Sequence, residues 1–126
     1  MTSRPILVVD DEPIVRESIR DWLKEAGYQV VTAETGEEAL EIIEKQDFGV
    51  IILDVRLPGK TGIAVLKEVK VLKPEIKSII ITAYPSGELA REAMQLGAVD
   101  YLIKPISADS LERLIQETLV KLESEN

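Results

Sequence analysis

Short apolar runs recur along the chain, and each is followed by a segment whose apolar residues have helical spacing. The runs Ile6–Val9 and Val50–Leu53 contain no polar alternation, so we expect strands that are covered on both faces. Gly and Pro residues separate the runs from their neighbours. The predicted strands are Ile6–Val9, Gln29–Thr32, Val50–Leu53, Ile79–Ile81 and Tyr101–Ile103.

The segments between the runs carry the usual signals of helix ends. The first helix is predicted to begin at Pro13, which a first helical turn tolerates, and to stop before Gly27. Its apolar stripe makes Trp22 a core residue rather than a functional aromatic. The stripe consists of Val15, Ile19, Trp22, Leu23 and Ala26.

Four more helices follow the same logic. Thr35 and Glu38 have the spacing of a capping box, and Pro74 ends a helix over Ile63–Leu72. A further helix is predicted between Ser86 and Gly97. Ser107 can cap the last one, whose apolar side comprises Leu111, Leu114, Ile115, Thr118 and Leu122.

Five βα units in succession predict an α/β fold. Strands that alternate with helices form a parallel sheet with right-handed crossovers and helices on both faces. The 126 residues fit the usual size of one domain. We therefore expect a single domain over residues 1–126, with its core at about residues 5–122, and we find no linker or repeat.

Composition excludes several functions. The sequence has no Cys and no His, which excludes disulfide scaffolds, cysteine catalysis, Ser-His-Asp triads and the common zinc sites. Its formal net charge of −8 argues against direct binding of DNA or RNA. The N-terminal apolar run is too short for a signal peptide, and no run is long enough to span a membrane. We expect a cytoplasmic protein.

Polar residues stand where the predicted strands end. The first strand ends in Asp10 and Asp11, the third in Asp54, the fourth in Thr82 and the fifth in Lys104. In open α/β sheets, ligands bind beyond the carboxyl ends of the strands, where the strand order reverses. If the first, third, fourth and fifth strands are neighbours, three carboxylates, a hydroxyl and an ammonium share one cleft.

This set of groups suits phosphoryl chemistry on a carboxylate. Clustered carboxylates repel one another and need a cation, and a site of oxygen ligands favours a hard ion such as Mg²⁺. A lysine beside the metal suits a phosphate dianion. Asp54 stands apart from the acid pair and is the candidate nucleophile, which would form an aspartyl phosphate.

Each feature also has an ordinary structural explanation. The acids from Asp10 to Glu12 could simply cap the helix that starts at Pro13, and Asp54 could be a turn residue. The coincidence of all these residues at strand ends favours a site. Gly59-Lys60-Thr61 resembles a Walker A end, but the required first glycine is replaced by Asp54, so we reject nucleotide binding there.

Six short stretches along the chain form a recognisable set. They are Ile6-Leu-Val-Val-Asp-Asp-Glu12, Ile51-Ile-Leu-Asp54, Leu57-Pro-Gly-Lys-Thr-Gly62, Ile81-Thr-Ala83, Gly97-Ala98 and Tyr101-Leu-Ile-Lys-Pro105. Together they resemble the receiver domain of two-component response regulators, in the CheY-like superfamily. The resemblance covers roughly Pro5 to Leu122, and a looser likeness points to receivers of AAA+ transcriptional activators. The resemblance implies a flavodoxin-like (βα)₅ doubly wound sheet with strand order 2-1-3-4-5.

The resemblance also implies roles for the strand-end residues. Asp54 would accept a phosphoryl group from a histidine kinase or a histidine phosphotransfer protein. Mg²⁺ would be ligated directly by Asp11 and Asp54, through water by Asp10, and by the backbone oxygen of Arg56. Lys104 would contact the phosphoryl group.

The same resemblance implies a switch. Thr82 would hydrogen-bond a phosphoryl oxygen and Tyr101 would move in response, which changes the face formed by the fourth helix, fifth strand and fifth helix. A homodimer partner or an effector domain would bind that face. Lys104-Pro105 would be a cis peptide, and Arg56 and Tyr84 would tune the lifetime of the phosphoryl group.

Under this interpretation the chain is not an enzyme, beyond promoting its own phosphorylation and dephosphorylation. Two other classes stay open. A phosphohydrolase of the haloacid dehalogenase type needs a second Asp two residues after the nucleophile, where this chain has Arg56. A phosphorylation-independent interaction module would have a vestigial pocket. The sequence names neither the kinase nor the output.

Overall fold

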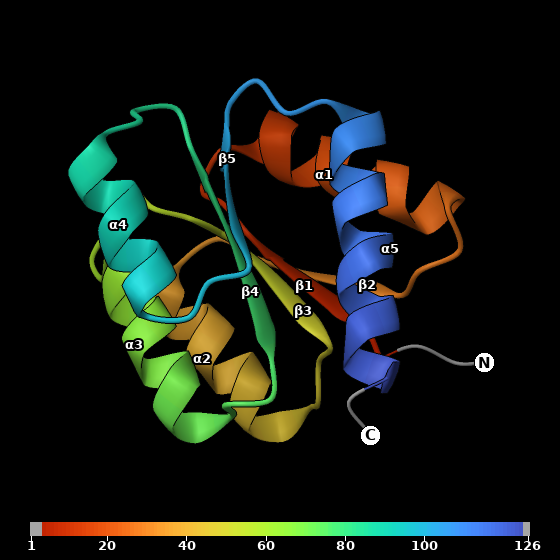
Figure 1. Ribbon diagram of the computed structural model, residues 1–126, viewed down its shortest axis with the longest axis horizontal. Helices are drawn as coiled ribbons and strands as arrows, with labels where there is room; N and C mark the ends of the chain where they lie inside the picture. The colour runs from red at the N-terminus through yellow and green to blue at the C-terminus, as the bar shows by residue number, and fades with distance from the viewer. Residues whose placement is uncertain (1–3, 125–126) are drawn as a thin grey trace.

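Five parallel strands form one twisted sheet in the order β2-β1-β3-β4-β5, at the centre of the molecule (Figure 1). The computed structural model describes residues 4–124, with side chains described to residue 121. The predicted flavodoxin-like (βα)₅ topology is thereby confirmed. The strands are β1 (Ile6–Val9), β2 (Val30–Ala33), β3 (Val50–Asp54), β4 (Lys77–Thr82) and β5 (Asp100–Ile103).

Helices cover both faces of the sheet. Figure 1 shows α1 and α5 together on one face and α2, α3 and α4 on the other. Each helix follows the strand that the sequence pattern assigned to it. The helices are α1 (Pro13–Glu25), α2 (Gly36–Lys45), α3 (Gly62–Leu72), α4 (Gly87–Gln95) and α5 (Ala108–Ser124).

Helix ends follow the predicted local chemistry. The hydroxyl of Thr35 accepts a hydrogen bond from the Glu38 N–H at 3.1 Å, which is one half of the predicted capping box. The Glu38 carboxylate accepts from the Glu34 N–H, one residue before the N-cap, rather than from Thr35. Gly27 and Gly97 follow α1 and α4 with φ of 99° and 93°, a backbone conformation that favours glycine. The predicted bounds of β1 are correct, whereas those of the other four strands are short or shifted by one or two residues, because hydrogen bonding across the sheet extends past the apolar runs.

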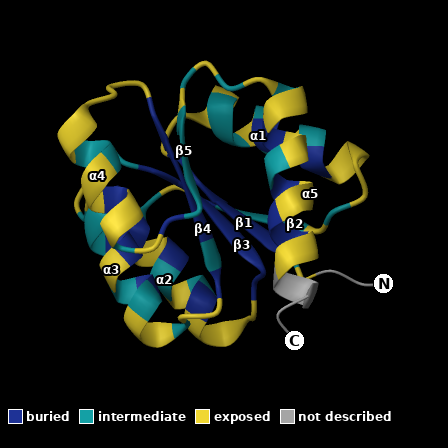
Figure 2. Cartoon of the chain, viewed as in Figure 1, coloured by how far each residue is buried: buried dark blue, intermediate teal, exposed yellow. Residues whose placement is uncertain are grey.

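Two apolar layers fill the space between sheet and helices. Alternate residues of each strand enter different layers: Leu7 and Val9 pack toward α2, α3 and α4, whereas Ile6 and Val8 pack toward α1 and α5. The inner strands β1, β3 and β4 are therefore buried nearly throughout, whereas the edge strands β2 and β5 are mostly half-buried (Figure 2). Trp22 is partly buried against the α1 and α5 layer, as its place on the stripe predicts. Leu122 lies outside the described side chains.

The sheet register brings the carboxyl ends of β1, β3, β4 and β5 together. Val9 pairs with Leu53, Asp54 with Ile81, and Thr82 with Ile103. The residues that follow these strands therefore leave the sheet at one edge. Among the described residues, no helix is both long and apolar enough to cross a membrane.

Close packing at Gly62 holds the segment after β3 in place. A Cβ at this position would lie 2.2 Å from the carbonyl oxygen of Asp54 and 2.7 Å from the Cα of Val55, both backbone atoms. The Gly62 N–H donates to the Val55 carbonyl at 2.9 Å. The start of α3 thus packs directly against the backbone of Asp54.

We expect Gly62→Ala to lower the free energy of unfolding by roughly 2 kcal/mol or more, because the added methyl group must displace backbone rather than a flexible side chain. Gly87→Ala is the matched control, since a Cβ there meets nothing within 4 Å. Urea denaturation measures both. Equal stability of the two variants would contradict the close approach at Gly62.

Candidate functional site

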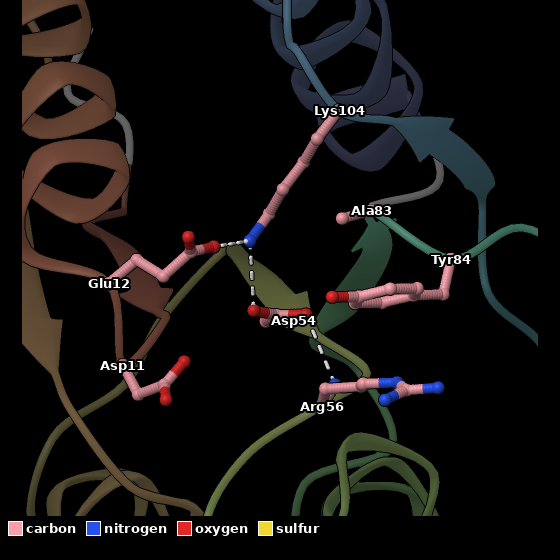
Figure 3. A pocket seen from close by; sticks show the side chains of 7 residues that line it. All are labelled: Asp11, Glu12, Asp54, Arg56, Ala83, Tyr84 and Lys104. Carbon is pink, nitrogen blue, oxygen red and sulfur yellow. Dashed lines mark hydrogen bonds and ion pairs between the residues drawn. The ribbon is translucent and has the colours of Figure 1, made fainter.

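A polar cleft opens at the carboxyl edge of the sheet, where the sequence predicted a site. It has a volume of about 250 Å³. Figure 3 shows its side chains converging from β1, β3, β4 and β5. The lining residues are Asp11, Glu12, Asp54, Arg56, Ala83, Tyr84 and Lys104.

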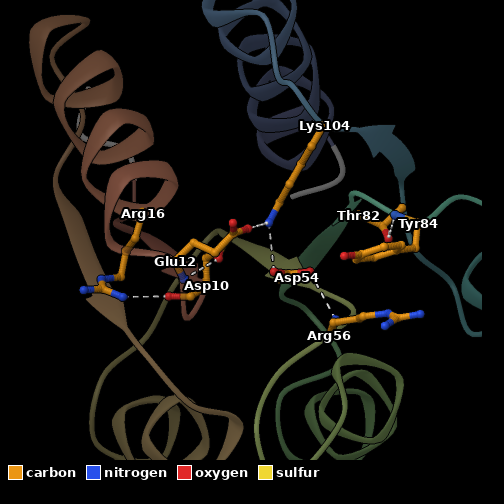
Figure 4. A network of polar contacts seen from close by, with 8 residues as sticks. All are labelled: Asp10, Glu12, Arg16, Asp54, Arg56, Thr82, Tyr84 and Lys104. Atoms are coloured by element: carbon orange, nitrogen blue, oxygen red, sulfur yellow. Dashed lines mark hydrogen bonds and ion pairs between the residues drawn. The ribbon is translucent and has the colours of Figure 1, made fainter.

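The turn between β1 and α1 presents three successive acids in different environments. Asp10 is fully buried, while Asp11 and Glu12 are exposed at the cleft. The Oδ1 atom of Asp10 accepts the Glu12 N–H at 2.9 Å, and the main-chain oxygen of Asp10 accepts from Nη1 of Arg16 at 2.8 Å (Figure 4). Local hydrogen bonds therefore define this turn.

Lys104 joins the acids of two loops. Its Nζ atom lies 3.0 Å from Oδ2 of Asp10 and 3.0 Å from Oδ2 of Asp54, and it also pairs with Oε1 of Glu12. The side chains of Lys104 and Asp54 are only 9% and 5% exposed. The other oxygen of Asp54 accepts the Arg56 N–H at 3.1 Å. The peptide bond between Lys104 and Pro105 is cis, as the resemblance implied.

Burial and charge perturb the ionisation of this cluster. Burial raises the pKa of Asp10 from 3.8 to about 6, against the opposing effects of the Glu12 N–H and Lys104. Burial alone would lower the pKa of Lys104, but its hydrogen bonds to Glu12, Asp10 and Asp54 outweigh this effect and raise the pKa above its usual value. The ammonium is therefore held in its charged form by the acids around it.

Thr82 lies beside the cleft but is itself buried. Its hydroxyl accepts the Tyr84 N–H at 2.9 Å, which ties it to the loop after β4. The guanidinium of Arg56 stacks on the Tyr84 ring at 3.9 Å from the ring centroid, so these two residues form one wall. Tyr101 is partly buried, and its hydroxyl accepts the Ser86 N–H at 3.1 Å.

The donor set fits a hard divalent cation. Asp10, Glu12 and Asp54 each offer a carboxylate oxygen, and these oxygens lie within 4.8 Å of one another. The buried Oδ2 of Asp10 lies 3.0 Å from the ammonium of Lys104, which also contacts Glu12 and Asp54. A buried anionic oxygen that shares one ammonium with two other carboxylates suits Mg²⁺, which prefers oxygen ligands.

The structure thus brings together the residues predicted at the strand ends. Asp11, Asp54, Arg56 and Lys104 line the cleft, and Asp10 and Thr82 are buried next to it. For Glu12, the alternative of a simple capping role is wrong, because its side chain makes no capping hydrogen bond to α1.

Sequence reasoning missed two participants. Glu12 pairs with Lys104 through its carboxylate, although the sequence marks it only as the third acid of a stretch. Its position directly after Asp10 and Asp11 was the signal that could have identified it as a site residue. Arg16 carried no signal in the sequence, since most arginines on amphipathic helices are solvated. Both contacts arise from the way the turn folds back on α1.

The strand order 2-1-3-4-5 and the acidic cleft with its lysine define an α/β domain of the flavodoxin-like class. A family model described as "Response regulator receiver domain" matches residues 6–116. The chain belongs to the response regulator receiver domain family, whose members are signalling domains of two-component systems and bind Mg²⁺ at an acidic pocket.

Individual relatives agree with this assignment. The chain is 43% identical over 123 residues to the transcriptional regulatory protein ZraR of Escherichia coli, covering 94% of this chain but 27% of that protein. It therefore spans about a quarter of the length of that relative. It is 34% identical to the sporulation initiation phosphotransferase F of Bacillus subtilis, covering 94% of this chain and 96% of that protein.

A solved structure shows the same fold. The CheY-like response regulator receiver domain protein of Methanospirillum hungatei superposes with a TM-score of 0.96 at 33% identity, covering 99% of this chain and 100% of that one. The strand order and the helices around it are therefore those of a receiver domain.

Asp10 gives a pH-dependent prediction. Its pKa in the folded protein, about 6, lies above its ordinary value of 3.8, so its ionisation costs stability. The contribution of the protonated Asp10 carboxyl to folding stability is fully present below pH 3.8 and is lost as the pH rises through about 6. In EDTA, we expect Asp10→Asn to raise the free energy of unfolding near pH 7 by on the order of 1–3 kcal/mol.

Urea denaturation with EDTA, at pH 7 and near pH 4, measures this effect. The gain should shrink near pH 4, where the wild-type carboxyl is largely protonated. Asp11→Asn is the control, because that acid is exposed and its neutralisation should change stability by less than about 0.5 kcal/mol. A loss of stability in Asp10→Asn at pH 7 would show that the buried charge is not unfavourable.

Proposed function

We propose that the chain is one receiver domain, with its core at about residues 5–122, that accepts a phosphoryl group on Asp54. The observation that carries this proposal is the position of the Asp54 carboxylate. It lines the cleft, is almost buried, and contacts a buried lysine through Oδ2. A carboxylate so placed can attack the phosphorus of a phosphohistidine: a P–O bond forms, the P–N bond breaks, and the imidazole leaves with a proton.

Mg²⁺ is the proposed cofactor. Asp11, Asp54 and the backbone oxygen of Arg56 would hold it directly and Asp10 through water, and the position of Glu12 makes that acid a further neighbour. When bound, the ion neutralises charge on the carboxylates and on the transferred group. Lys104 would then turn from the carboxylates toward a phosphoryl oxygen, with its positive charge retained.

The phosphoryl donor would be a partner protein. This chain has no His, so a phosphohistidine must come from a histidine kinase or a histidine phosphotransfer protein. The name of the Bacillus subtilis relative, a phosphotransferase similar over nearly its whole length, supports phosphoryl transfer. The chain would promote only its own phosphorylation and dephosphorylation. The predicted cytoplasmic location stays a prediction.

The output would leave through the face formed by α4, β5 and α5. A phosphoryl group adds roughly two negative charges, and the buried hydroxyl of Thr82 is the donor placed to respond. Its movement would release the Tyr84 N–H and shift the loop that the Tyr101 hydroxyl also contacts. A second copy or an effector domain would bind the altered face. The relative ZraR is named a transcriptional regulator, so we propose control of transcription, with an AAA+ effector as a prediction.

Phosphorylation at Asp54 has a direct test. Acetyl phosphate with Mg²⁺ should add one phosphoryl group, which intact mass spectrometry detects and hydroxylamine removes. Asp54→Asn should take up none, while Asp11→Asn should retain the acceptor but react much more slowly. Modification that survives Asp54→Asn, or that proceeds fully in EDTA, would exclude this function and favour a different site.

Thr82→Ala tests the switch separately from the chemistry. The variant should still take phosphate at Asp54, because it keeps the nucleophile and Lys104, but it should lose the shift of the Tyr101 ring signals that phosphate induces in NMR spectra. Phosphate-dependent dimerisation, followed by analytical ultracentrifugation, should be lost with it. If phosphorylated Thr82→Ala shows the same Tyr101 shift and dimerisation as the wild type, the proposed coupling between Thr82 and Tyr101 is wrong.

A further inference from the structure

Arg16 holds both ends of the acidic turn between β1 and α1. Its backbone N–H donates to the carbonyl of Glu12 at 2.9 Å, and its Nη1 atom donates to the carbonyl of Asp10 at 2.8 Å. Figure 4 shows the guanidinium reaching back from α1 to the start of the turn. The first backbone hydrogen bond of α1 thus fixes the end of the turn, and the side chain of Arg16 fixes its start.

No side-chain hydrogen bond from the N-cap residue fixes the start of α1. Glu12 occupies the N-cap position without a side-chain hydrogen bond to the helix, and Pro13 follows it without an N–H to offer. By contrast, Thr35, Thr61 and Ser86 cap α2, α3 and α4 with their hydroxyls. At α1 the capping acids are engaged elsewhere, since Glu12 pairs with Lys104 and Asp10 is buried.

We propose that Arg16 is a positioning residue for metal binding, which sets the spacing of the Asp10, Asp11 and Glu12 carboxylates by clamping the main chain of their turn. Arg16 does not line the cleft and contacts a carbonyl rather than a carboxylate, so it acts through the backbone. This inference rests on the proposed Mg²⁺ site and adds a residue that sets its affinity.

The charge of Arg16 and its clamp act on metal affinity in opposite directions. A guanidinium near an acidic site repels a divalent cation, so removal of the charge alone would tighten Mg²⁺ binding. Removal of the clamp lets the turn relax and spreads the carboxylates, which weakens binding. Partners that orient metal ligands typically contribute about tenfold or more to affinity. The sign of the change therefore separates the two effects.

The test is a Mg²⁺ titration of the unphosphorylated protein, followed by amide NMR shifts. Arg16→Met keeps an unbranched stem but removes every donor, and Arg16→Lys keeps the charge and one donor group. Arg20→Met is the matched control, since Arg20 lies on the same helix and pairs with the adjacent Asp21 at 3.0 Å. We expect about tenfold weaker binding for Arg16→Met, partial recovery for Arg16→Lys, and less than about a twofold change for Arg20→Met.

The same samples, free of metal, provide a second readout. The Glu12 N–H donates to Oδ1 of Asp10, so hydrogen exchange at this amide reports the geometry of the turn. Arg16→Met should speed that exchange at least about tenfold, a change that Arg20→Met should not produce. Amides in α5 serve as the check that global stability is unchanged.

The outcomes test the Mg²⁺ site and the role of Arg16 separately. Tighter Mg²⁺ binding in Arg16→Met overturns the positioning role, because the charge of Arg16 alone would then affect the affinity. Unchanged binding also overturns it, because Arg16 would then have no effect on the affinity. Equal weakening in Arg20→Met overturns it as well. If the wild type shows no saturable titration, the Mg²⁺ site of the proposed function fails together with this inference. Saturation in the wild type with an unaffected Arg16→Met removes only the role of Arg16.

Discussion

One buried ammonium compensates a group of acids that could not otherwise lie together. Lys104 is held within 3.0 Å of both Asp10 and Asp54 and also pairs with Glu12, so acids from the ends of two strands depend on a single cation. Partly buried carboxylates at this spacing repel one another strongly unless a positive charge offsets them. Three carboxylates share this one ammonium, and burial raises the pKa of Asp10 even with Lys104 beside it. The excess of acids over cations is the basis of the proposed use of the cleft as a metal site.

The fold supplies the rigidity that such a cluster requires. The strand ends that carry these residues are fixed by the parallel register and by apolar layers on both faces, so the carboxylates cannot move apart to relieve repulsion. Gly62 lets α3 press against the backbone of Asp54, which confines this acid further. The clustered carboxylates at this edge of the sheet lower the stability of the fold, and the burial of apolar strand residues elsewhere offsets that loss.

The cleft is asymmetric, and its two walls serve different purposes. On one side, the turn from Asp10 to Glu12 is tied down by Arg16, which suits a metal site that needs constant geometry. On the other side, Thr82, Tyr84 and Arg56 are joined by one hydrogen bond and one stacking contact at an exposed loop. Contacts of that kind are weak and can be exchanged, which suits a wall that must respond to a new charge. Under the proposed function, metal binding and response to phosphorylation would thus be separated within one small cleft.

Local signals in the sequence determined much of this protein. The period of the apolar residues, Gly27, Gly97 and the Thr35 cap are properties of neighbouring residues, so the helices, the strands and their parallel arrangement could be predicted without coordinates. The strand order was implied by the resemblance to receiver domains. Asp54, Lys104 and Thr82 were predictable as well, because strand ends share one edge of a parallel sheet. Which acid meets Lys104 was not predictable: Asp10, Asp11 and Glu12 are adjacent in the chain, and only the fold of their turn buries the first and turns the third toward the lysine. The Arg16 clamp and the stacking of Arg56 on Tyr84 were likewise decided by tertiary structure, since no spacing in the sequence encodes a contact between a side chain and a distant loop.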